Sequence, residues 1–310
     1  MDYIFFSVGL VLLLVGADCL VSAASGLARR LGVSALTTAV VVVGFGTSMP
    51  ELLTSIDAAL QGSPALAIAN VVGSNIANIL LVLGFSALCV PLVCNPAPMR
   101  RDLPCLVFAS VLAVFALQQG IVGRWMGLAL GGAMLSYLVI VLITSRSEHD
   151  ASAEGLPPEQ LDARGVGGAL LRSLLSIGIL AFGAHLLVSG ALGIAREHGI
   201  SESVIGLTLV AIGTSLPELA VAVLALVRRE ADVAIGNIIG SNLFNILGIL
   251  GITALISPLA VPATIASFDV WIMLAAALAL AIFVRTGWRL TRVEGGALLL
   301  SYPVYLAVVT

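Results

Sequence analysis

The sequence predicts an all-α membrane protein of ten transmembrane helices, arranged as two five-helix halves of inverted topology. Two observations predict this fold class. Hydrophobic residues make up 60% of the 310 residues and charged residues only 10%, whereas a soluble domain carries about 25% charged residues. The second half of the chain also repeats the first half at a fixed offset. The net charge is −3, and no basic run interleaved with aromatic residues occurs, so we do not expect nucleic-acid binding.

Ten stretches are long and apolar enough for a spanning helix, which needs about 20 apolar residues. They cover residues 4–27, 34–60, 65–91, 103–119, 124–145, 167–195, 203–227, 233–257, 265–285 and 292–309. Several exceed the minimum length, so we expect tilted or broken helices. The one sizeable polar stretch, 146–166, predicts an exposed linker between a first repeat, 1–145, and a second repeat, 167–310.

Arginine alone predicts the orientation, because the chain contains no lysine. Twelve arginines lie at the span ends on the linker side, and only Arg124 and Arg196 lie on the other side. Positively charged loops stay in the cytoplasm. We therefore expect a cytoplasmic linker and two extracytoplasmic termini.

The internal repeat has an offset of 167 residues, which takes Gly46 to Gly213. Residues 46–84 align with 213–251 without a gap, with 18 identities in 39 positions. Each half holds five predicted spans, and an odd number makes the second half enter the membrane from the opposite side. Transporters with inverted repeats place their binding site near the bilayer midplane, on broken helices.

The motif GTSMPE at 46–51 recurs as GTSLPE at 213–218, and each interrupts an apolar span. Thr47 and Glu51 are four residues apart and share a helix face. Pro50 lacks an N–H and clashes with the carbonyl four residues before it, so the second helix should break there, and the seventh likewise. A carbonyl oxygen freed in a bilayer needs a partner, and a bound cation is one.

A second polar stripe follows on the third and eighth predicted helices. Residues four apart form it, namely Asn70, Ser74 and Asn78, repeated as Asn237, Ser241 and Asn245. Together with the motifs, these groups offer only oxygen-bearing side chains. Ca²⁺ prefers roughly six to eight oxygen ligands, whereas zinc and copper prefer nitrogen and sulfur. Four asparagines have the alternative interpretation of hydrogen-bonding groups that hold helices together: Asn70, Asn75, Asn237 and Asn242.

Glu51 and Glu218 carry the strongest functional signal. An ionised carboxylate at the bilayer centre costs a few kcal/mol, and two facing carboxylates repel each other. One Ca²⁺, two Na⁺ or protons would relieve both costs, and mutually exclusive occupancy of one site is what an exchanger needs. The other classes are a cation channel and a membrane-embedded hydrolase with Ser48 or Ser215 as nucleophile. No histidine or lysine lies near either serine in sequence, so we expect neither an enzyme nor a cofactor.

Four further polar residues remain open from the sequence. Asp18 and His185 occupy equivalent repeat positions and could pair, relay protons or simply hydrogen-bond near helix ends. Asp57 has no equivalent acid in the second repeat and is interpreted as solvated or structural. Asp269 is interpreted as exposed near the outer end of the ninth helix.

The motifs GTSMPE with NVVGSNIANILLVLG, and GTSLPE with GNIIGSNLFNILGILG, resemble the two alpha-repeats of the cation/calcium antiporter superfamily. They are most similar to those of prokaryotic sodium/calcium exchangers. The resemblance implies that helices 2, 3, 7 and 8 pack around four cation sites and that helices 1 and 6 slide to alternate access. It implies exchange of Ca²⁺ against Na⁺ in a prokaryotic inner membrane, surrounded by lipid. Calcium/proton antiport is the alternative on the same fold.

The resemblance also implies a ligand set. Its central members are Glu51 and Glu218, joined by Thr47, Ser48, Thr214, Ser215, Ser74, Ser241, Asn78 and Asn245. Asn245 stands where some relatives carry an aspartate. With an amide there, potassium dependence is not expected, and the number of sodium ions per cycle stays open.

Overall fold

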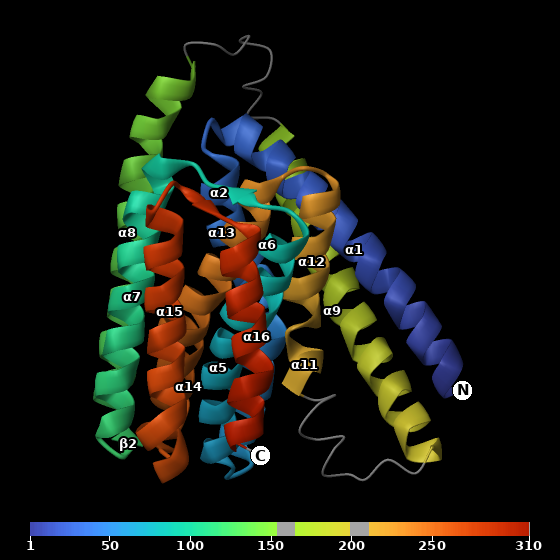
Figure 1. Cartoon of the computed structure of the whole chain (residues 1–310), viewed down its shortest axis with the longest axis vertical. Coiled ribbons are helices and arrows are strands. Elements are labelled where there is room, and N and C mark those ends of the chain that lie inside the picture. Colours follow the sequence, from blue (N-terminus) through green and yellow to red (C-terminus); the bar gives the residue numbers. More distant parts are fainter. Residues whose placement is uncertain (154–164, 199–210, 310) are drawn as a thin grey trace.

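The computed structural model describes residues 1–153, 165–198 and 211–309, and this part of the chain is almost wholly helical (Figure 1). Within these residues, eight helices are long and apolar enough to cross a membrane, or nine if one bent pair counts as a span. They correspond to every predicted span except the seventh, 203–227, which lies partly outside the described residues. The protein is an integral membrane protein.

In the first half of the chain the helices and strands follow one another with short connections. They are α1 (Asp2–Leu31), α2 (Ala35–Thr38), the π-helical η1 (Ala39–Gly44), α3 (Phe45–Thr47), α4 (Met49–Leu60), α5 (Pro64–Ala77), the π-helical η2 (Asn78–Leu83), α6 (Gly84–Cys89), β1 (Leu92–Val93), α7 (Pro96–Gln118), β2 (Ile121–Val122) and α8 (Arg124–Ala153). The first eight residues of the predicted linker, 146–153, prolong α8.

The second half has a matching order. Its elements are α9 (Val166–Glu197), α11 (Ala211–Thr214), α12 (Leu216–Val227), α13 (Ala231–Leu243), the π-helical η6 (Phe244–Ile249), α14 (Leu250–Ile256), β3 (Leu259–Ala260), the π-helical η7 (Ile265–Asp269), α15 (Val270–Arg285), β4 (Arg289–Leu290) and α16 (Arg292–Val309). The offset of 167 residues takes both ends of α4 to those of α12, and β1 to β3.

The fourth predicted span begins earlier than its apolar stretch. We expected it at residue 103, but α7 starts at Pro96. The Asn95 side chain accepts a hydrogen bond from the Ala97 N–H (3.1 Å), which caps the helix. Pro96 takes the first helical position, where its missing N–H removes no intrahelical bond. A polar, proline-containing segment is therefore helical because its first turn is capped.

The second predicted span is bent by 40° between Thr47 and Met49. Ser48 lies in the break (φ −87°, ψ 8°), and Ser215 has nearly the same backbone angles (φ −90°, ψ 5°) between α11 and α12. The break thus lies two residues before Pro50, not at the proline. The proline takes the second position of the new helix, which tolerates a missing N–H.

Two short antiparallel strand pairs join the halves at opposite ends of the bundle (Figure 1). Strand β1 pairs with β4, and β2 pairs with β3. Adding the repeat offset of 167 to the residue numbers of β1 gives β3, and adding it to those of β2 gives β4 to within one residue. The repeat therefore relates the pair β1–β4 to the pair β3–β2. This is the pattern that a two-fold axis between the halves produces.

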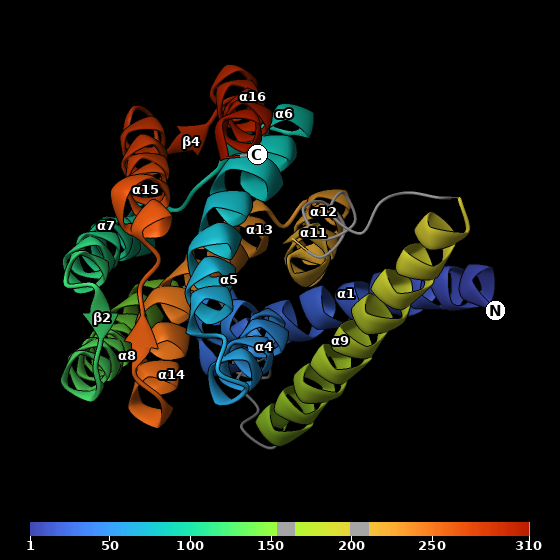
Figure 2. The ribbon, with the colours of Figure 1, turned by 90° about the horizontal axis from the view of Figure 1, so that it is seen from below.

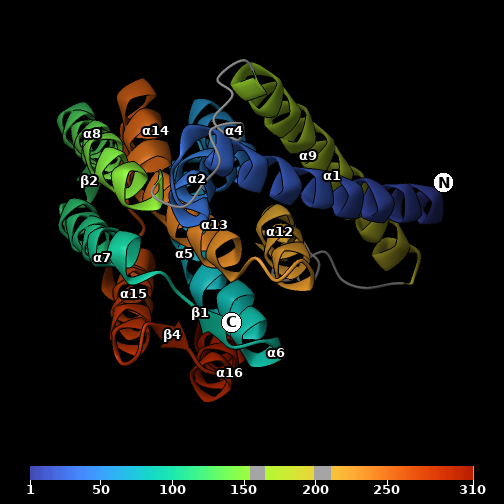
Figure 3. The ribbon, with the colours of Figure 1, turned by 90° about the horizontal axis from the view of Figure 1, so that it is seen from above.

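Helices α1 and α9 pack along each other and lie beside the rest of the bundle (Figures 2 and 3). Their backbones approach so closely that side chains would not fit at the crossing. A Cβ atom on Gly9 would lie 2.3 Å from the Leu187 nitrogen, and one on Gly183 would lie 2.5 Å from the Leu13 nitrogen. Glycine therefore permits this close contact.

The centre of the bundle is the segment α13–η6–α14. In the most apolar 18-residue stretch of this segment 89% of the residues are buried, whereas in α16, at the periphery, only 17% are buried. Helix α13 packs directly on η1, where a Cβ atom on Gly240 would lie 2.2 Å from the Val40 carbonyl oxygen. This contact brings the polar stripe of α13 against the break of the second span.

Candidate cation-binding site

Glu51 and Glu218 occupy equivalent positions at two helix starts. Each is the third residue after a break, in the first turn of α4 or of α12. Both side chains are fully buried, at 0% exposure. The first-turn N–H groups have no intrahelical acceptors, and the positive end of the helix dipole favours a negative charge there. The two breaks therefore place two carboxyl groups inside the bundle at favourable positions.

The Glu218 carboxylate is held by hydroxyl groups from both halves of the chain. Its Oε1 accepts a hydrogen bond from Ser48 Oγ (3.1 Å), in the break of the second span, and one from Ser241 Oγ (3.3 Å), on α13. Its Oε2 is buried and has no hydrogen-bond partner among the described residues. One oxygen of this carboxylate therefore remains available to a ligand.

Thr47 extends the same cluster. Its Oγ1 lies 3.1 Å from Asn237 Oδ1, 3.2 Å from Ser241 Oγ and 3.3 Å from the Gly44 carbonyl oxygen. Ser241 Oγ also lies 3.0 Å from that carbonyl. Three elements thus place oxygen atoms next to Glu218: a carbonyl from η1, a hydroxyl from α3, and a hydroxyl and an amide from α13.

Glu51 has a different environment from its repeat equivalent. Both of its carboxylate oxygens are buried without a hydrogen-bond partner among the described residues. Its backbone carbonyl accepts a bond from Asn70 Nδ2 (3.1 Å). At the equivalent position, Asn237 Nδ2 donates to the Glu218 carbonyl (3.3 Å). The two asparagines therefore fix the backbone of the two glutamates from neighbouring helices.

Asn78 and Asn245 are two further buried residues with unused hydrogen-bonding capacity. All side-chain oxygen and nitrogen atoms of both amides are buried and have no partner among the described residues, and the same holds for Ser215 Oγ. Buried polar atoms in proteins are nearly always paired. Asn78 begins η2 and Asn245 lies in η6, and such π-helical turns occur frequently at functional sites.

The two remaining predicted site residues are at least partly buried. Ser74 is buried on α5, and Thr214 is half-buried at the end of α11. The structure assigns Asn75 and Asn242 to a different role from Asn70 and Asn237, because each donates to the carbonyl four residues before it in its own helix (2.7 and 2.9 Å). The interpretation as contacts between helices is confirmed for Asn70 and Asn237 and is wrong for Asn75 and Asn242.

An aromatic contact that we did not expect supports the break. Phe45 on α3 stacks on Phe244 in η6, with ring centroids 4.8 Å apart and an interplanar angle of 22°. The two residues directly precede the first signature motif and Asn245. Their equivalents in the repeat are Ile212 and Ala77, so the repeat alignment contains no sign of this pair.

The polar residues that the sequence left open lie outside this cluster. Asp18 forms a two-point ion pair with Arg228 (2.6 and 2.8 Å), not a contact with His185, which is exposed. Asp57 is exposed and accepts a bond from Gln61 (2.7 Å). Asp269 was expected to be exposed; it is 9% exposed and accepts a bond from the Tyr305 hydroxyl (3.0 Å). That expectation was wrong because the C-terminal helix covers this carboxylate.

The cluster has the chemistry of an oxygen-ligand site. Among the described residues, no three histidine, cysteine, aspartate or glutamate side chains come together as a metal-binding group. The groups that do gather around the two glutamates are hydroxyls, amides and backbone carbonyls. Such neutral oxygens suit hard cations and do not suit zinc or copper.

Comparison with known proteins decides the family. The profile described as "Sodium/calcium exchanger protein" matches residues 1–143 and 168–310, two segments that begin 167 residues apart. The chain belongs to the sodium/calcium exchanger family. The resemblance inferred from the two motifs is thereby confirmed, and the members of this family are transporters rather than enzymes.

The similarity to several relatives covers nearly the whole length of this chain. The chain is 39% identical to the putative antiporter CaxA of Alkalimonas amylolytica (97% of this chain, 96% of that protein) and 34% identical to the sodium/calcium exchanger MaX1 of Methanosarcina acetivorans (99% and 98%). It is 38% identical to the inner membrane protein YrbG of Escherichia coli (91% and 87%). The solved structure of the sodium–calcium exchanger NCX_Mj superposes with a TM-score of 0.86 at 32% identity, covering 99% of this chain and 98% of that one.

Proposed function

We propose that this protein exchanges Ca²⁺ against Na⁺ across a prokaryotic inner membrane, through one buried site that includes both glutamates. The observation that carries the proposal is the pair Glu51 and Glu218. Both are fully buried, and three of their four carboxylate oxygens have no hydrogen-bond partner among the described residues. The family, and the relatives named as sodium/calcium exchangers, support the choice of ions.

A cation would balance the two negative charges. A single carboxylate at the bilayer centre costs about 3 kcal/mol on insertion scales, and two close carboxylates add their repulsion. One Ca²⁺ or two Na⁺ removes both penalties. Because the same oxygens serve either ion, Ca²⁺ and Na⁺ exclude each other, and this competition couples their transport.

Further ligands would come from neutral oxygens around the carboxylates. We assign this role to Thr47, Ser48, Thr214, Ser215, Ser74, Ser241, Asn78 and Asn245. Together with the glutamates they can supply the roughly six to eight oxygens that Ca²⁺ prefers. The unused polar atoms of Asn78, Asn245 and Ser215 support this assignment, since a bound cation or its water would give their oxygens a partner.

We infer that access alternates through an inverted repeat of five plus five helices, 1–145 and 167–310. The exchange of the two strand pairs under the repeat offset supports a two-fold axis in the membrane plane. The distribution of arginine supports a cytoplasmic linker, 146–166, and extracytoplasmic termini.

The deciding experiment is ⁴⁵Ca²⁺ uptake into proteoliposomes preloaded with Na⁺. The Na⁺ gradient is then replaced by a pH gradient in a parallel sample. We expect uptake with the Na⁺ gradient and none with the pH gradient alone. Uptake driven only by protons would replace Na⁺ with H⁺ as the coupling ion, and Ca²⁺ flux without any counter-gradient coupling would indicate a channel.

A further inference from the structure

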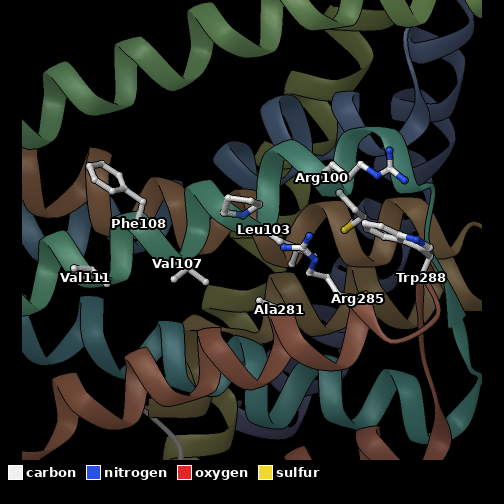
Figure 4. Close-up of a pocket in the computed structure, with 10 residues that line it drawn as sticks. Arg100, Leu103, Val107, Phe108, Val111, Ala281, Arg285 and Trp288 are labelled. Atoms are coloured by element: carbon white, nitrogen blue, oxygen red, sulfur yellow. The ribbon is translucent and has the colours of Figure 1, made fainter.

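A groove lies between α7 and α15 on the arginine-rich side of the protein (Figure 4), and neither glutamate lines it. It encloses about 640 Å³. At one end lie Arg100, Arg285 and Trp288, and apolar side chains line the rest, including Val107 and Phe108. We propose that this groove binds an anionic phospholipid, with the phosphodiester at the arginines and an acyl chain along the apolar wall.

The charge at the head of the groove is unpaired within the described part of the chain. Neither Arg100 nor Arg285 has a carboxylate within ion-pair distance there, and both are exposed. The Arg100 guanidinium lies over the Trp288 ring, 5.4 Å from its centroid, which holds this cation in place without neutralising it. Tryptophan is enriched at the membrane interface, where lipid headgroups lie. Two cations there complement a phosphate.

The apolar part of the groove has the length of one lipid leaflet. Its α7 wall consists of residues on one helix face, namely Arg100, Leu103, Pro104, Val107, Phe108 and Val111. The helix rises by about 16 Å between Arg100 and Val111, close to half of the roughly 30 Å hydrocarbon core. Phe108 and Val111 are 62% and 49% exposed, so the far end of the groove opens toward the bilayer.

The internal repeat shows that the fold itself does not require these cations. The offset relates Arg100 to Ser267, Arg285 to Gln118 and Trp288 to Ile121, at the opposite end of the same helix pair. There the Gln118 side chain donates a hydrogen bond to the Ala266 carbonyl and ties the two helices together. The same architecture therefore stands with neutral residues. The arginine end instead combines charge, an interfacial aromatic ring and an apolar groove, which is the composition of a phospholipid site.

The test uses the groove's own tryptophan as the probe. Replacing the other two tryptophans, Trp125→Phe and Trp271→Phe, leaves Trp288 as the single fluorophore. The full-length protein is reconstituted in phosphatidylcholine vesicles that contain one part in ten of a brominated lipid, either phosphatidylglycerol or phosphatidylcholine. We expect brominated phosphatidylglycerol to quench Trp288 with a relative binding constant about tenfold higher, since each arginine near an anionic surface contributes appreciably.

Two variants separate the parts of the site. Arg100→Gln with Arg285→Gln should reduce the preference to about one, whereas Arg30→Gln with Arg229→Gln, which removes the same charge from the same side elsewhere, should leave it unchanged. Ala281→Phe keeps both arginines but fills the groove, and it should also abolish the preference.

Three results would overturn the proposal. The first is equal quenching by the two lipids in the parent protein. The second is a preference that survives the Arg100 and Arg285 substitutions. The third is displacement of the lipid by soluble glycerol phosphate at equal concentration, because the acyl chain would then contribute nothing.

Discussion

Glu51 and Glu218 lie in nearly the same sequence motif but differ in their hydrogen bonds. Oε1 of Glu218 receives hydroxyl donors from Ser48 and Ser241, whereas neither carboxylate oxygen of Glu51 has a partner among the described residues. The site is thus not symmetric in this conformation. The carboxylate without donors gains more from a cation, because the cation would provide its first favourable partner.

Neutralising either glutamate should abolish exchange. Glu51→Gln and Glu218→Gln each keep the side-chain volume but remove one of the two negative charges that balance Ca²⁺. A lost buried charge partner costs about 3 kcal/mol, which is roughly a hundredfold in affinity. We expect Na⁺-driven ⁴⁵Ca²⁺ uptake to fall at least that far in each variant, while both proteins still insert and purify.

Asp57→Asn is the matched control for this prediction. It removes a carboxylate from the same helix, α4, but that carboxylate is exposed and bonded to Gln61. Uptake by this variant should equal that of the unchanged protein. Normal transport by either glutamine variant would contradict the assignment of the site.

Asn245 offers the opposite change, a third carboxylate. Its amide is buried without a partner among the described residues, so Asn245→Asp adds charge at nearly constant shape. Three close carboxylates repel one another, and one of them should take up a proton near neutral pH. We expect Ca²⁺ uptake by this variant to decline by several-fold between pH 8 and pH 6, measured against the same titration of the unchanged protein. An identical pH profile would remove Asn245 from the site.

At the scale of elements, hydrophobicity predicted where the helices lie along the sequence better than it predicted their local geometry. Length and apolar character predicted most of the described spans within a few residues, because crossing a bilayer imposes both. The α7 start was missed because a capping contact at Asn95 decided it. The π-helical turns at Asn78 and Asn245 were not predicted, since no residue pattern distinguishes them from α-helix.

The site was predictable in composition but not in detail. Two glutamates in apolar spans were informative because buried charge is costly. The roles of the asparagines were not separable, because Asn70 and Asn75 differ only in the helix face they occupy. One reaches a neighbouring helix and the other bonds its own. Phe45 and Phe244 make their contact across 199 residues of sequence, beyond the reach of any local pattern.

The close packing of α13 on η1 predicts that replacing Gly240 by alanine lowers the stability of the protein. In Gly240→Ala the new methyl group would lie 2.2 Å from the Val40 carbonyl oxygen, so the backbones must separate. Overpacking of this kind costs about 1–3 kcal/mol, more than the roughly 1 kcal/mol that alanine gains over glycine in a helix. We expect a lower midpoint of thermal unfolding in detergent, by several degrees.

The repeat provides the control for that substitution. Gly73 is equivalent to Gly240, and no described heavy atom lies within 4 Å of the position that an added methyl group would take. Gly73→Ala should leave the unfolding midpoint unchanged or raise it. Equal destabilisation by both substitutions would mean that the contact with η1 is not the cause of the loss at position 240, because helix propensity alone would stabilise both variants.

At the scale of the whole molecule, α1 and α9 form a unit of their own. Their backbones meet at Gly9 and Gly183, and they lie beside the remaining helices (Figure 2). Two polar contacts tie this unit to the connection between α12 and α13: Asp18 pairs with Arg228, and Ser25 donates a hydrogen bond to Glu230. Under the proposed alternating access, a movement of this pair along the bundle would break these contacts.

The Asp18–Arg228 ion pair should therefore influence how often the α1–α9 pair occupies this position relative to the bundle, without influencing ion selectivity. Both side chains are more than a third exposed, so the pair contributes at most about 1 kcal/mol, or roughly a fivefold shift between states. We expect Asp18→Asn and Arg228→Gln to change the maximal rate of Na⁺-driven ⁴⁵Ca²⁺ uptake in the same direction, by up to that factor. Competition between Ca²⁺ and Sr²⁺ should stay unchanged. Exchanging the charges, Asp18→Arg with Arg228→Asp, should bring the rate back toward that of the unchanged protein. If the exchanged pair is slower than both single variants, the contact serves folding and not the movement.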